Sequence, residues 1–162
     1  MPKKFTDEEY HKMLPKKQVG AAVLFFNPAG EILIVKPDYK DGWLLPGGAT
    51  DDAESPLACA LRETKEEIGL DIPTLALAGI YYVRKNGIYP DGLKFLYDGG
   101  TLSSEQIAAI NLQNDELLEY RFAPIPEALG LLSPSLQKSV PACLEAIRTK
   151  TVAYIESLTP GE

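Results

Sequence analysis

The stretch from residue 48 to residue 70, GATDDAESPLACALRETKEEIGL, constrains the fold of this chain more than any other. Ser55 can cap a helix, Pro56 suits a first helical turn because its missing N–H is not needed there, and Gly69 can end the helix in a left-handed conformation. We therefore predict a helix from about Pro56 to Ile68. Residues suited to a buried stripe recur along it at helical spacing: Leu57, Ala60, Leu61, Thr64 and Ile68.

The same helix carries three glutamates, Glu63, Glu66 and Glu67, whose spacing brings their side chains together beside the buried stripe. Like charges at these spacings repel each other by about 0.2–0.5 kcal/mol per pair. Mg²⁺ binds through a few carboxylates, waters and substrate phosphates, so a cation would reverse the sign of this repulsion. Three glutamates alone are more often a solvated acidic helix face, and the flanking residues therefore decide between the two interpretations.

With its flanking residues, the helix resembles the Nudix box, G-x5-E-x7-R-E-U-x-E-E-x-G-U, in which U is an aliphatic residue. All fixed positions of that pattern match: Gly48, Glu54, Arg62, Glu63, Glu66, Glu67 and Gly69. Thr64 departs from the usual aliphatic residue at the first U, whereas Leu70 conforms at the last. Just upstream, residues 43–48 (WLLPGG) look like the family's strand that enters the box, with glycines that let the backbone pass close to substrate or metal.

The resemblance extends over roughly residues 17–150. Residues 18–26 and 31–35 read as two strands joined by a turn, and residues 75–83 and 93–98 are further β-rich runs. Residues 115–126 resemble the family's late segment, which carries an acidic residue, a strand and a short helix. The resemblance implies an α/β protein with the Nudix fold, a mixed β-sheet sandwiched between α-helices. We expect one such domain over residues 1–162.

The two ends of the chain are expected to be helical additions to this domain. In the N-terminal arm, residues 1–16, Thr6 and Glu9 form a capping box for a short helix that stops near Leu14 and serves as a packing arm. In the C-terminal segment, residues 133–162, Pro141 is expected to interrupt a helix. An amphipathic terminal helix is then expected from the spacing of Leu144, Ile147, Thr151, Tyr154, Ile155 and Leu158. Its apolar face could dock on the same chain or on a second copy, so a homodimer is possible.

The resemblance also implies an activity. Nudix hydrolases split a phosphoanhydride bond of a nucleoside diphosphate linked to another group, which suggests a nucleoside triphosphate or a nucleotide sugar as the small-molecule substrate. The implied cofactor is Mg²⁺, with Mn²⁺ as a possible substitute. Its implied ligands are the carboxylates of Glu63, Glu66 and Glu67 and the carbonyl of Gly48.

The remaining roles follow from the same resemblance. Glu67 or Glu66 is expected to be indispensable to metal binding, and Glu116 is a fourth candidate metal or base carboxylate. One of the three box glutamates, or Glu116, is expected to accept a proton from the attacking water. Arg62 is expected to pair with Glu54 and to orient the other carboxylates. The number of metal ions and the identity of the base stay open.

Two alternative functions stay open as well. A Nudix fold can serve as a nucleotide sensor that binds without turnover, or as a prenyl diphosphate isomerase. A sensor could lose box glutamates, whereas this chain keeps them all, and the isomerase would call for further cysteine and glutamate motifs. Release of phosphate or nucleotide separates the hydrolase from the sensor.

Composition limits the classes of partner that this chain is expected to bind. A formal net charge of −7 and a pI near 4.8 argue against general nucleic-acid binding, because phosphate backbones need excess Lys and Arg. Cys59 and Cys143 form no metal or redox motif, and no signal peptide or membrane-length apolar run is seen, so we expect a cytoplasmic protein with no membrane contact. Some basic and aromatic residues could contact phosphates or a base, although surface and core roles respectively are the default: Lys17, Lys36, Lys40, Arg84 and Lys94; Tyr39, Trp43, Tyr81, Tyr82 and Tyr89.

Overall fold

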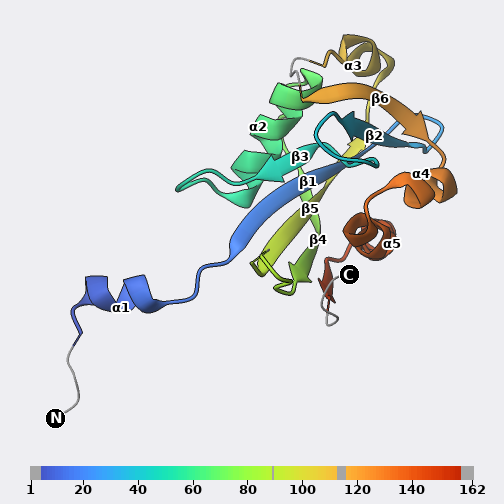
Figure 1. The fold of residues 1–162 in the computed structure, drawn as a ribbon. Helices are drawn as coiled ribbons and strands as arrows, with labels where there is room; N and C mark the ends of the chain where they lie inside the picture. The colour runs from blue at the N-terminus through green and yellow to red at the C-terminus, as the bar shows by residue number, and fades with distance from the viewer. Residues whose placement is uncertain (1–4, 89, 113–115, 158–162) are drawn as a thin grey trace.

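The structure is a computed structural model that describes residues 5–88, 90–112 and 116–157. Helices and strands are interspersed along the chain (Figure 1). The helices are α1 (Asp7–Met13), α2 (Pro56–Ile68), α3 (Ser104–Ala109), α4 (Ile125–Leu131) and α5 (Pro134–Thr149). The strands are β1 (Gln18–Phe26), β2 (Ile32–Pro37), β3 (Gly47–Ala49), β4 (Ala76–Val83), β5 (Gly92–Thr101), β6 (Leu117–Ala123) and β7 (Ala153–Glu156).

The strands form one mixed sheet in the order β6-β2-β1-β5-β4-β7, with β3 paired to β1. Strand β1 runs parallel to β5 along its whole length, from Gln18 opposite Gly92 to Phe26 opposite Thr101. On its other edge, β1 pairs antiparallel with β2 near its end and with β3 near its beginning. The chain that leads into α2 is therefore anchored to the central strand of the sheet.

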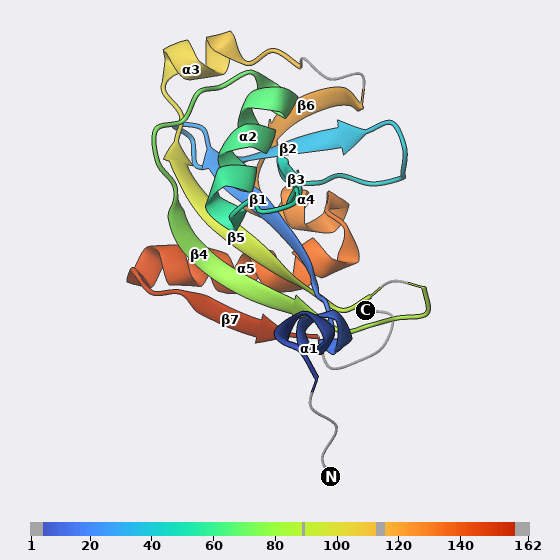
Figure 2. The ribbon, with the colours of Figure 1, turned by 90° about the vertical axis from the view of Figure 1, so that its left-hand side faces the viewer.

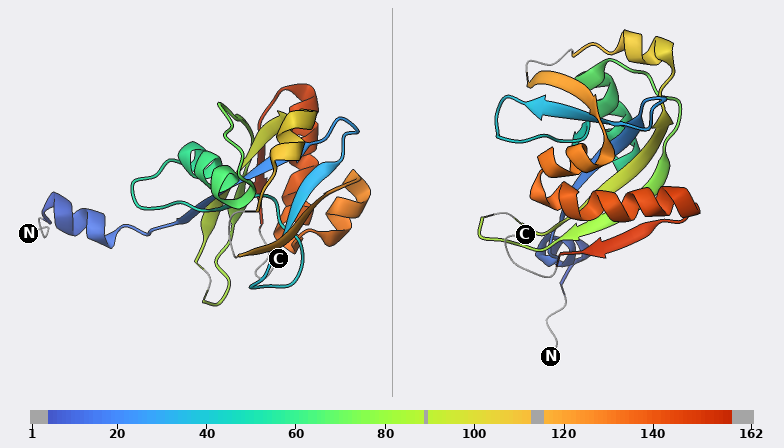
Figure 3. Two further views of the ribbon diagram at one scale, coloured as in Figure 1. Left: turned by 90° about the horizontal axis from the view of Figure 1, so that it is seen from above. Right: turned by 90° about the vertical axis from the view of Figure 1, so that its right-hand side faces the viewer.

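Apolar side chains form one core on each face of this sheet. Val23 and Phe25 of β1 contribute to a core with α2, whereas Leu24 between them contributes to a second core with α4 and α5. This alternation is the period of two that a strand imposes. Seen along the sheet, α2 lies on one side of the strands, and α4 and α5 lie on the other (Figures 2 and 3). The predicted α/β architecture, a mixed sheet between helices, is confirmed.

The C-terminal prediction was wrong in two respects. Helix α5 continues through Pro141, because the proline faces solvent while Val140 and Cys143 beside it are fully buried against the sheet. The helix then ends at Thr149, and residues 153–156 form β7 in parallel with β4, where a longer helix was expected. Leu158 lies outside the described residues. The apolar face of α5 docks on its own chain.

The N-terminal helix forms as predicted, but it does not pack. Thr6 caps α1, and its hydroxyl oxygen and the Glu9 carboxylate exchange hydrogen bonds with each other's backbone N–H groups. None of the residues of α1 is buried, and the helix stands away from the sheet (Figure 1). No helix in the described ranges is long and apolar enough to cross a bilayer.

Candidate active site

Helix α2 begins and ends where its sequence predicts. The Ser55 hydroxyl oxygen accepts a hydrogen bond from the N–H of Ala58 at 3.1 Å, and Pro56 occupies the first turn. At the other end, Gly69 adopts φ 75°, and its N–H donates to the carbonyl of Lys65 at 3.0 Å. These caps satisfy backbone groups that a helix otherwise leaves without partners.

The buried face of α2 differs slightly from the predicted stripe. Ala60, Thr64 and Ile68 are fully buried as expected, but Leu57 is 38% exposed and Cys59 is buried instead. The Thr64 hydroxyl donates to the carbonyl of Ala60 at 2.7 Å, so this polar side chain is satisfied inside the core. Threonine can therefore occupy the position where an aliphatic residue is more usual.

Glu67 is the buried carboxylate of the site, with 8% of the residue exposed. One of its oxygens accepts a hydrogen bond from the N–H of Gly47 at 2.7 Å, which joins α2 directly to β3. Burial, together with the negative charges of Glu63, Glu116 and Glu66, raises the pKa of Glu67 to about 8, against the opposing effect of the Gly47 N–H. The carboxylate is therefore short of positive charge.

The two glycines of β3 let neighbouring atoms approach the strand closely. A Cβ on Gly48 would lie 2.3 Å from a carboxylate oxygen of Glu63, so only glycine lets that side chain reach the strand. A Cβ on Gly47 would lie 2.1 Å from the main-chain oxygen of Ala21, and Gly47 has φ +149°. Close approach of main-chain atoms thus requires glycine at position 47, whereas the neighbour of Gly48 is the end of a flexible side chain.

Arg62 holds several of the other carboxylates. Its Nε and Nη2 donate to the two oxygens of Glu54 at 2.9 Å each, which confirms the predicted pair and gives it two-point geometry. Its Nη1 donates to Glu63 and to Glu66, again at 2.9 Å each. The Arg62 guanidinium is the largest cause that lowers the pKa of Glu54 to about 2, whereas burial raises the pKa of Glu63.

This arrangement separates Glu67 from the other two box glutamates. Glu63 and Glu66 turn to Arg62, and Glu67 turns to β3, so among the described residues no three acidic, histidine or cysteine side chains gather closely enough to hold an ion as they stand. Arg62 supplies the positive charge for Glu63 and Glu66. The predicted residues lie in one place, but their oxygens do not yet point to one centre.

Glu116 lies near the same carboxylates from a different part of the chain. The residue is exposed, and its carbonyl accepts a hydrogen bond from the N–H of Asp38 at 2.9 Å. Its negative charge acts on the pKa of both Glu67 and Tyr39, so the predicted fourth carboxylate belongs to this neighbourhood.

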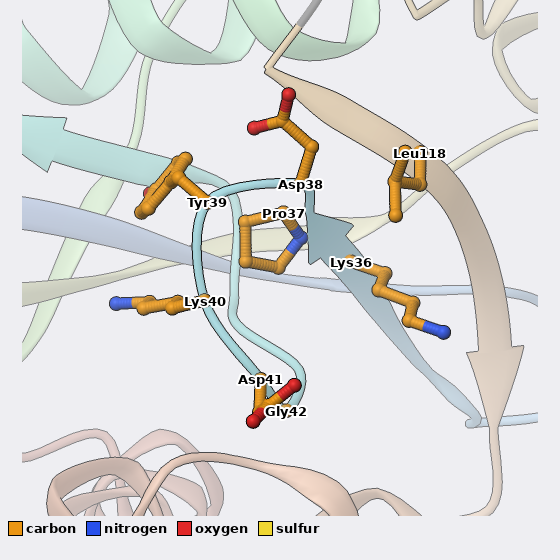
Figure 4. A pocket seen from close by; sticks show the side chains of 8 residues that line it. All are labelled: Lys36, Pro37, Asp38, Tyr39, Lys40, Asp41, Gly42 and Leu118. Carbon is orange, nitrogen blue, oxygen red and sulfur yellow. The ribbon is translucent and has the colours of Figure 1, made fainter.

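The loop 37–42, which contacts Glu116, also brings Tyr39 close to the carboxylates, a position that was not predicted. Tyr39 is 62% exposed, and burial of its ring atoms together with the charges of Glu67, Glu116 and Glu63 raises its pKa. It borders a pocket of about 380 Å³ under the loop 37–42 (Figure 4). Its sequence gives no signal of this, because only the pairing of β2 with β6 brings the loop to the carboxylates.

The other aromatic candidates for base contacts lie in different places, in the core or at the surface. Trp43 and Tyr81 are buried in the core on the α5 face. Tyr82 donates its hydroxyl to Asp91 at 3.0 Å, and Tyr89 lies outside the described residues. Tyr39 is therefore the described candidate that lies both exposed and close to the box glutamates.

The groups present fit a hard divalent cation. All of them are oxygen donors, the set that Mg²⁺ prefers, and neither cysteine is available because both are buried. The gap above Gly48 admits a carboxylate to the strand, and Glu67 is a buried carboxylate with little compensating positive charge. A cation would supply that charge. It would have to share or replace the contacts that Arg62 makes with Glu63 and Glu66.

A larger cleft opens on the other side of β3. It has a volume of about 710 Å³ and is bordered by Gly47, Gly48 and Ala49 of β3. Its walls include apolar residues from the sheet and from the start of α5: Val83, Leu93, Leu96 and Leu136. Strand β3, whose Gly47 N–H donates to Glu67, therefore also borders a space large enough for a nucleotide.

Comparison with known proteins identifies relatives of this chain. A family model described as the NUDIX domain matches residues 16–143. Over 122 residues the chain is 29% identical to an RNA pyrophosphohydrolase of a Nitratiruptor species, in a match that covers 67% of this chain and 77% of that protein. A stretch of 64 residues is 36% identical to the mRNA-decapping enzyme subunit 2 of Saccharomyces cerevisiae, covering 40% of this chain but only 6% of that protein.

The fold is also similar to solved structures. The NUDIX domain of Shewanella oneidensis NrtR, solved in complex with ADP ribose, matches with a TM-score of 0.70 and 16% identity. The match covers 88% of this chain and 99% of that one. At this identity the similarity concerns the fold.

Proposed function

The chain belongs to the Nudix family, whose model covers most of its length, and from this we propose that it is a Mg²⁺-dependent pyrophosphohydrolase. Its substrate is a nucleoside diphosphate linked to a further group, and the reaction adds water across the phosphoanhydride bond. The products are a nucleotide and the phosphorylated remainder.

One observation carries this proposal. Glu67 is buried, held against β3 by the Gly47 N–H, and surrounded by further carboxylates rather than by a basic partner of its own. A structural role alone would not require an acidic group here, because burying an uncompensated charge is costly. A cation site explains why an acidic side chain is kept at this position.

The residues divide into ligands and positioning groups. Glu63, Glu66, Glu67 and the Gly48 carbonyl would hold Mg²⁺ or Mn²⁺, which when bound neutralises the diphosphate and activates water. Arg62, fixed at two points by Glu54, positions Glu63 and Glu66 rather than touching substrate. One of the three box glutamates, or Glu116, accepts the proton of the attacking water.

The substrate is a small nucleotide rather than a long nucleic acid. Relatives are named for RNA and mRNA substrates, and one structural neighbour was solved with ADP ribose. The net charge of −7 disfavours a long phosphate backbone, whose binding is dominated by Lys and Arg contacts. We therefore place the recognised unit at the nucleotide and its phosphates.

The first test is a Mg²⁺-dependent hydrolysis screen of the full-length protein. The panel contains nucleoside triphosphates, oxidised nucleotides, nucleotide sugars, ADP-ribose, dinucleoside polyphosphates, coenzyme A and a short 5′-triphosphorylated RNA. Glu67→Gln keeps the shape of the side chain and removes its charge. We expect it to lower kcat at least about a hundredfold against the substrate that is turned over.

Matched controls decide the interpretation. Glu145→Gln changes an exposed glutamate on α5, paired with Arg148, and should leave turnover unchanged. Full activity of Glu67→Gln would overturn the assignment of this helix as the metal site. Binding of a panel member without release of phosphate or nucleotide would indicate the sensor, and an isomerised product would indicate the prenyl diphosphate isomerase.

A further inference from the structure

Two lysines border the cleft beyond β3 and form no ion pair with a carboxylate of the described residues. Lys94 of β5 and Lys40 of the loop 37–42 both border this cleft. The Lys94 ammonium donates to the hydroxyl oxygen of Ser135 at 3.4 Å, a long hydrogen bond to a neutral group. The described residues provide no ion pair for either lysine, although the chain carries an excess of acidic residues.

Two other basic candidates behave differently. Lys17, which also borders the cleft, pairs with Asp91. Lys36 lies over the ring of Trp43, and its side chain leaves the loop region in the direction opposite to that of Lys40 (Figure 4). Lys40 lies over the ring of Tyr39, with its Nζ 5.6 Å from the centroid, and shares with Lys94 a cleft in which neither lysine forms an ion pair with a described residue.

Their electrostatics agree with this placement. Lys94 reaches solvent within the cleft, but the surrounding protein lowers its pKa, and the positive charge of Lys40 lowers it further. Two like charges that are left without a counter-charge are unfavourable unless an anion joins them.

The sheet register fixes where Lys94 stands relative to the carboxylates. Lys94 is opposite Gly20 of β1, and Gly20 is opposite Ala49 of β3. Neighbouring strands lie about 4.8 Å apart, so the backbone of Lys94 is roughly 10 Å from the box strand. Gly20 carries no side chain to separate them. An extended polyphosphate could reach from the carboxylate site to the lysines.

We infer that Lys94 and Lys40 form an anion subsite in this cleft, and that the substrate carries a phosphate beyond the diphosphate that is cleaved. This inference rests on the proposed function. It selects nucleoside triphosphates and longer polyphosphates over nucleotide sugars, whose linked group is uncharged at that distance. The apolar walls of the cleft are left for the nucleoside.

The first test measures binding without turnover. Inorganic tripolyphosphate is titrated into the full-length protein by calorimetry in the presence of EDTA. We expect Lys94→Gln to weaken binding at least about tenfold, because a charge-assisted hydrogen bond is lost, and Lys94→Arg to retain most of it. Lys36→Gln is the matched control, because it removes the same charge outside the cleft.

The result is decisive in either direction. Equal affinities for wild type, Lys94→Gln and Lys36→Gln, or no binding by the wild type, would overturn the subsite. Because Glu67→Gln should bind tripolyphosphate at least as well as the wild type, the experiment is independent of hydrolysis. Failure of the proposed hydrolase would appear only in the turnover screen.

The second test uses two substrates with the same nucleoside. Steady-state hydrolysis of UTP and of UDP-glucose is compared in Mg²⁺. Lys94→Gln should raise KM for UTP at least about tenfold and leave KM for UDP-glucose within about twofold. An equal effect on both substrates would contradict a subsite for the additional phosphate.

Discussion

At the scale of single residues, the contact between Glu67 and Gly47 combines two requirements. The buried carboxylate fastens α2 to β3, and it also keeps a charge that the fold alone does not need. Its cost in the absence of metal should be visible in the stability of the protein.

That cost has a definite pH dependence. Because the pKa of Glu67 is raised to about 8 in the folded protein from its ordinary value of 4.5, the native state binds more protons than the unfolded chain between these values. In EDTA, stability should therefore be highest at the acidic end of this window and fall as pH rises toward 8, by up to about 1.4 kcal/mol per pH unit.

Urea unfolding at pH 5.5, 6.5 and 7.5 measures this slope. The difference between wild type and Glu67→Gln isolates the contribution of Glu67, because Glu63 also has a raised pKa. Parallel curves for the two proteins would contradict the assignment.

The glycines of β3 should separate stability from activity. Gly47→Ala places a Cβ against main-chain atoms of Ala21 and Ala22 at φ +149°, so we expect a loss of more than about 2 kcal/mol in unfolding free energy. Gly48→Ala meets only the flexible end of Glu63, so its loss should stay below about 1 kcal/mol while hydrolysis falls sharply. Urea unfolding and the turnover assay, run on both variants, check this; the reverse order would count against it.

At the scale of helices and strands, sequence patterns predicted the features that depend only on residues close together in the chain. The caps of α2, the capping box of α1, and the strands from β1 to β6 in the matched region follow from residues that act within a few positions of one another. The box predicted the pairing of Arg62 with Glu54 for the same reason. Other features depend on tertiary contacts, which no local pattern specifies. These are the position of Tyr39 near the carboxylates, the exposure of Leu57, and the direction in which Glu63 and Glu66 point.

The C-terminal segment shows how tertiary contacts override a local signal. The apolar residues that suggested a helix from Leu144 to Leu158 include Ile155, which packs from β7 instead. Lys150 ends α5 in the left-handed conformation with φ 54°, although it is not a glycine. The free edge of β4 then offers hydrogen bonds to residues 153–156 that further helix would not.

Pro141 should be a removable weakness of α5. A proline in a helix interior lacks one hydrogen bond and is about 3 kcal/mol less favourable than alanine, partly offset by its stiffening of the unfolded chain. Because Pro141 is exposed, Pro141→Ala should stabilise the protein by about 1–2 kcal/mol in urea unfolding. Ala142→Gly, its neighbour, should destabilise by about 1 kcal/mol. A loss of stability in Pro141→Ala would contradict this prediction.

At the scale of the whole molecule, the sheet and its two cores stand without the N-terminal arm. Because α1 has no buried residue, deletion of residues 1–15 should change the unfolding free energy by less than about 0.5 kcal/mol and leave hydrolysis unaltered. Thermal unfolding and the turnover assay measure both. A clear destabilisation would show that the arm packs on the sheet in solution.

The parallel pairing of β1 with β5 also sets the order in which the chain can fold as it is synthesised. β1 leaves the ribosome early, but its full-length partner begins only at Gly92 and ends at Thr101. Until then, one edge of the central strand has no partner. Helix α2 has also been made before the residues of β5 and β6 that complete its core. A nascent chain stalled before β5 would thus present apolar strand residues to chaperones, however complete its box is.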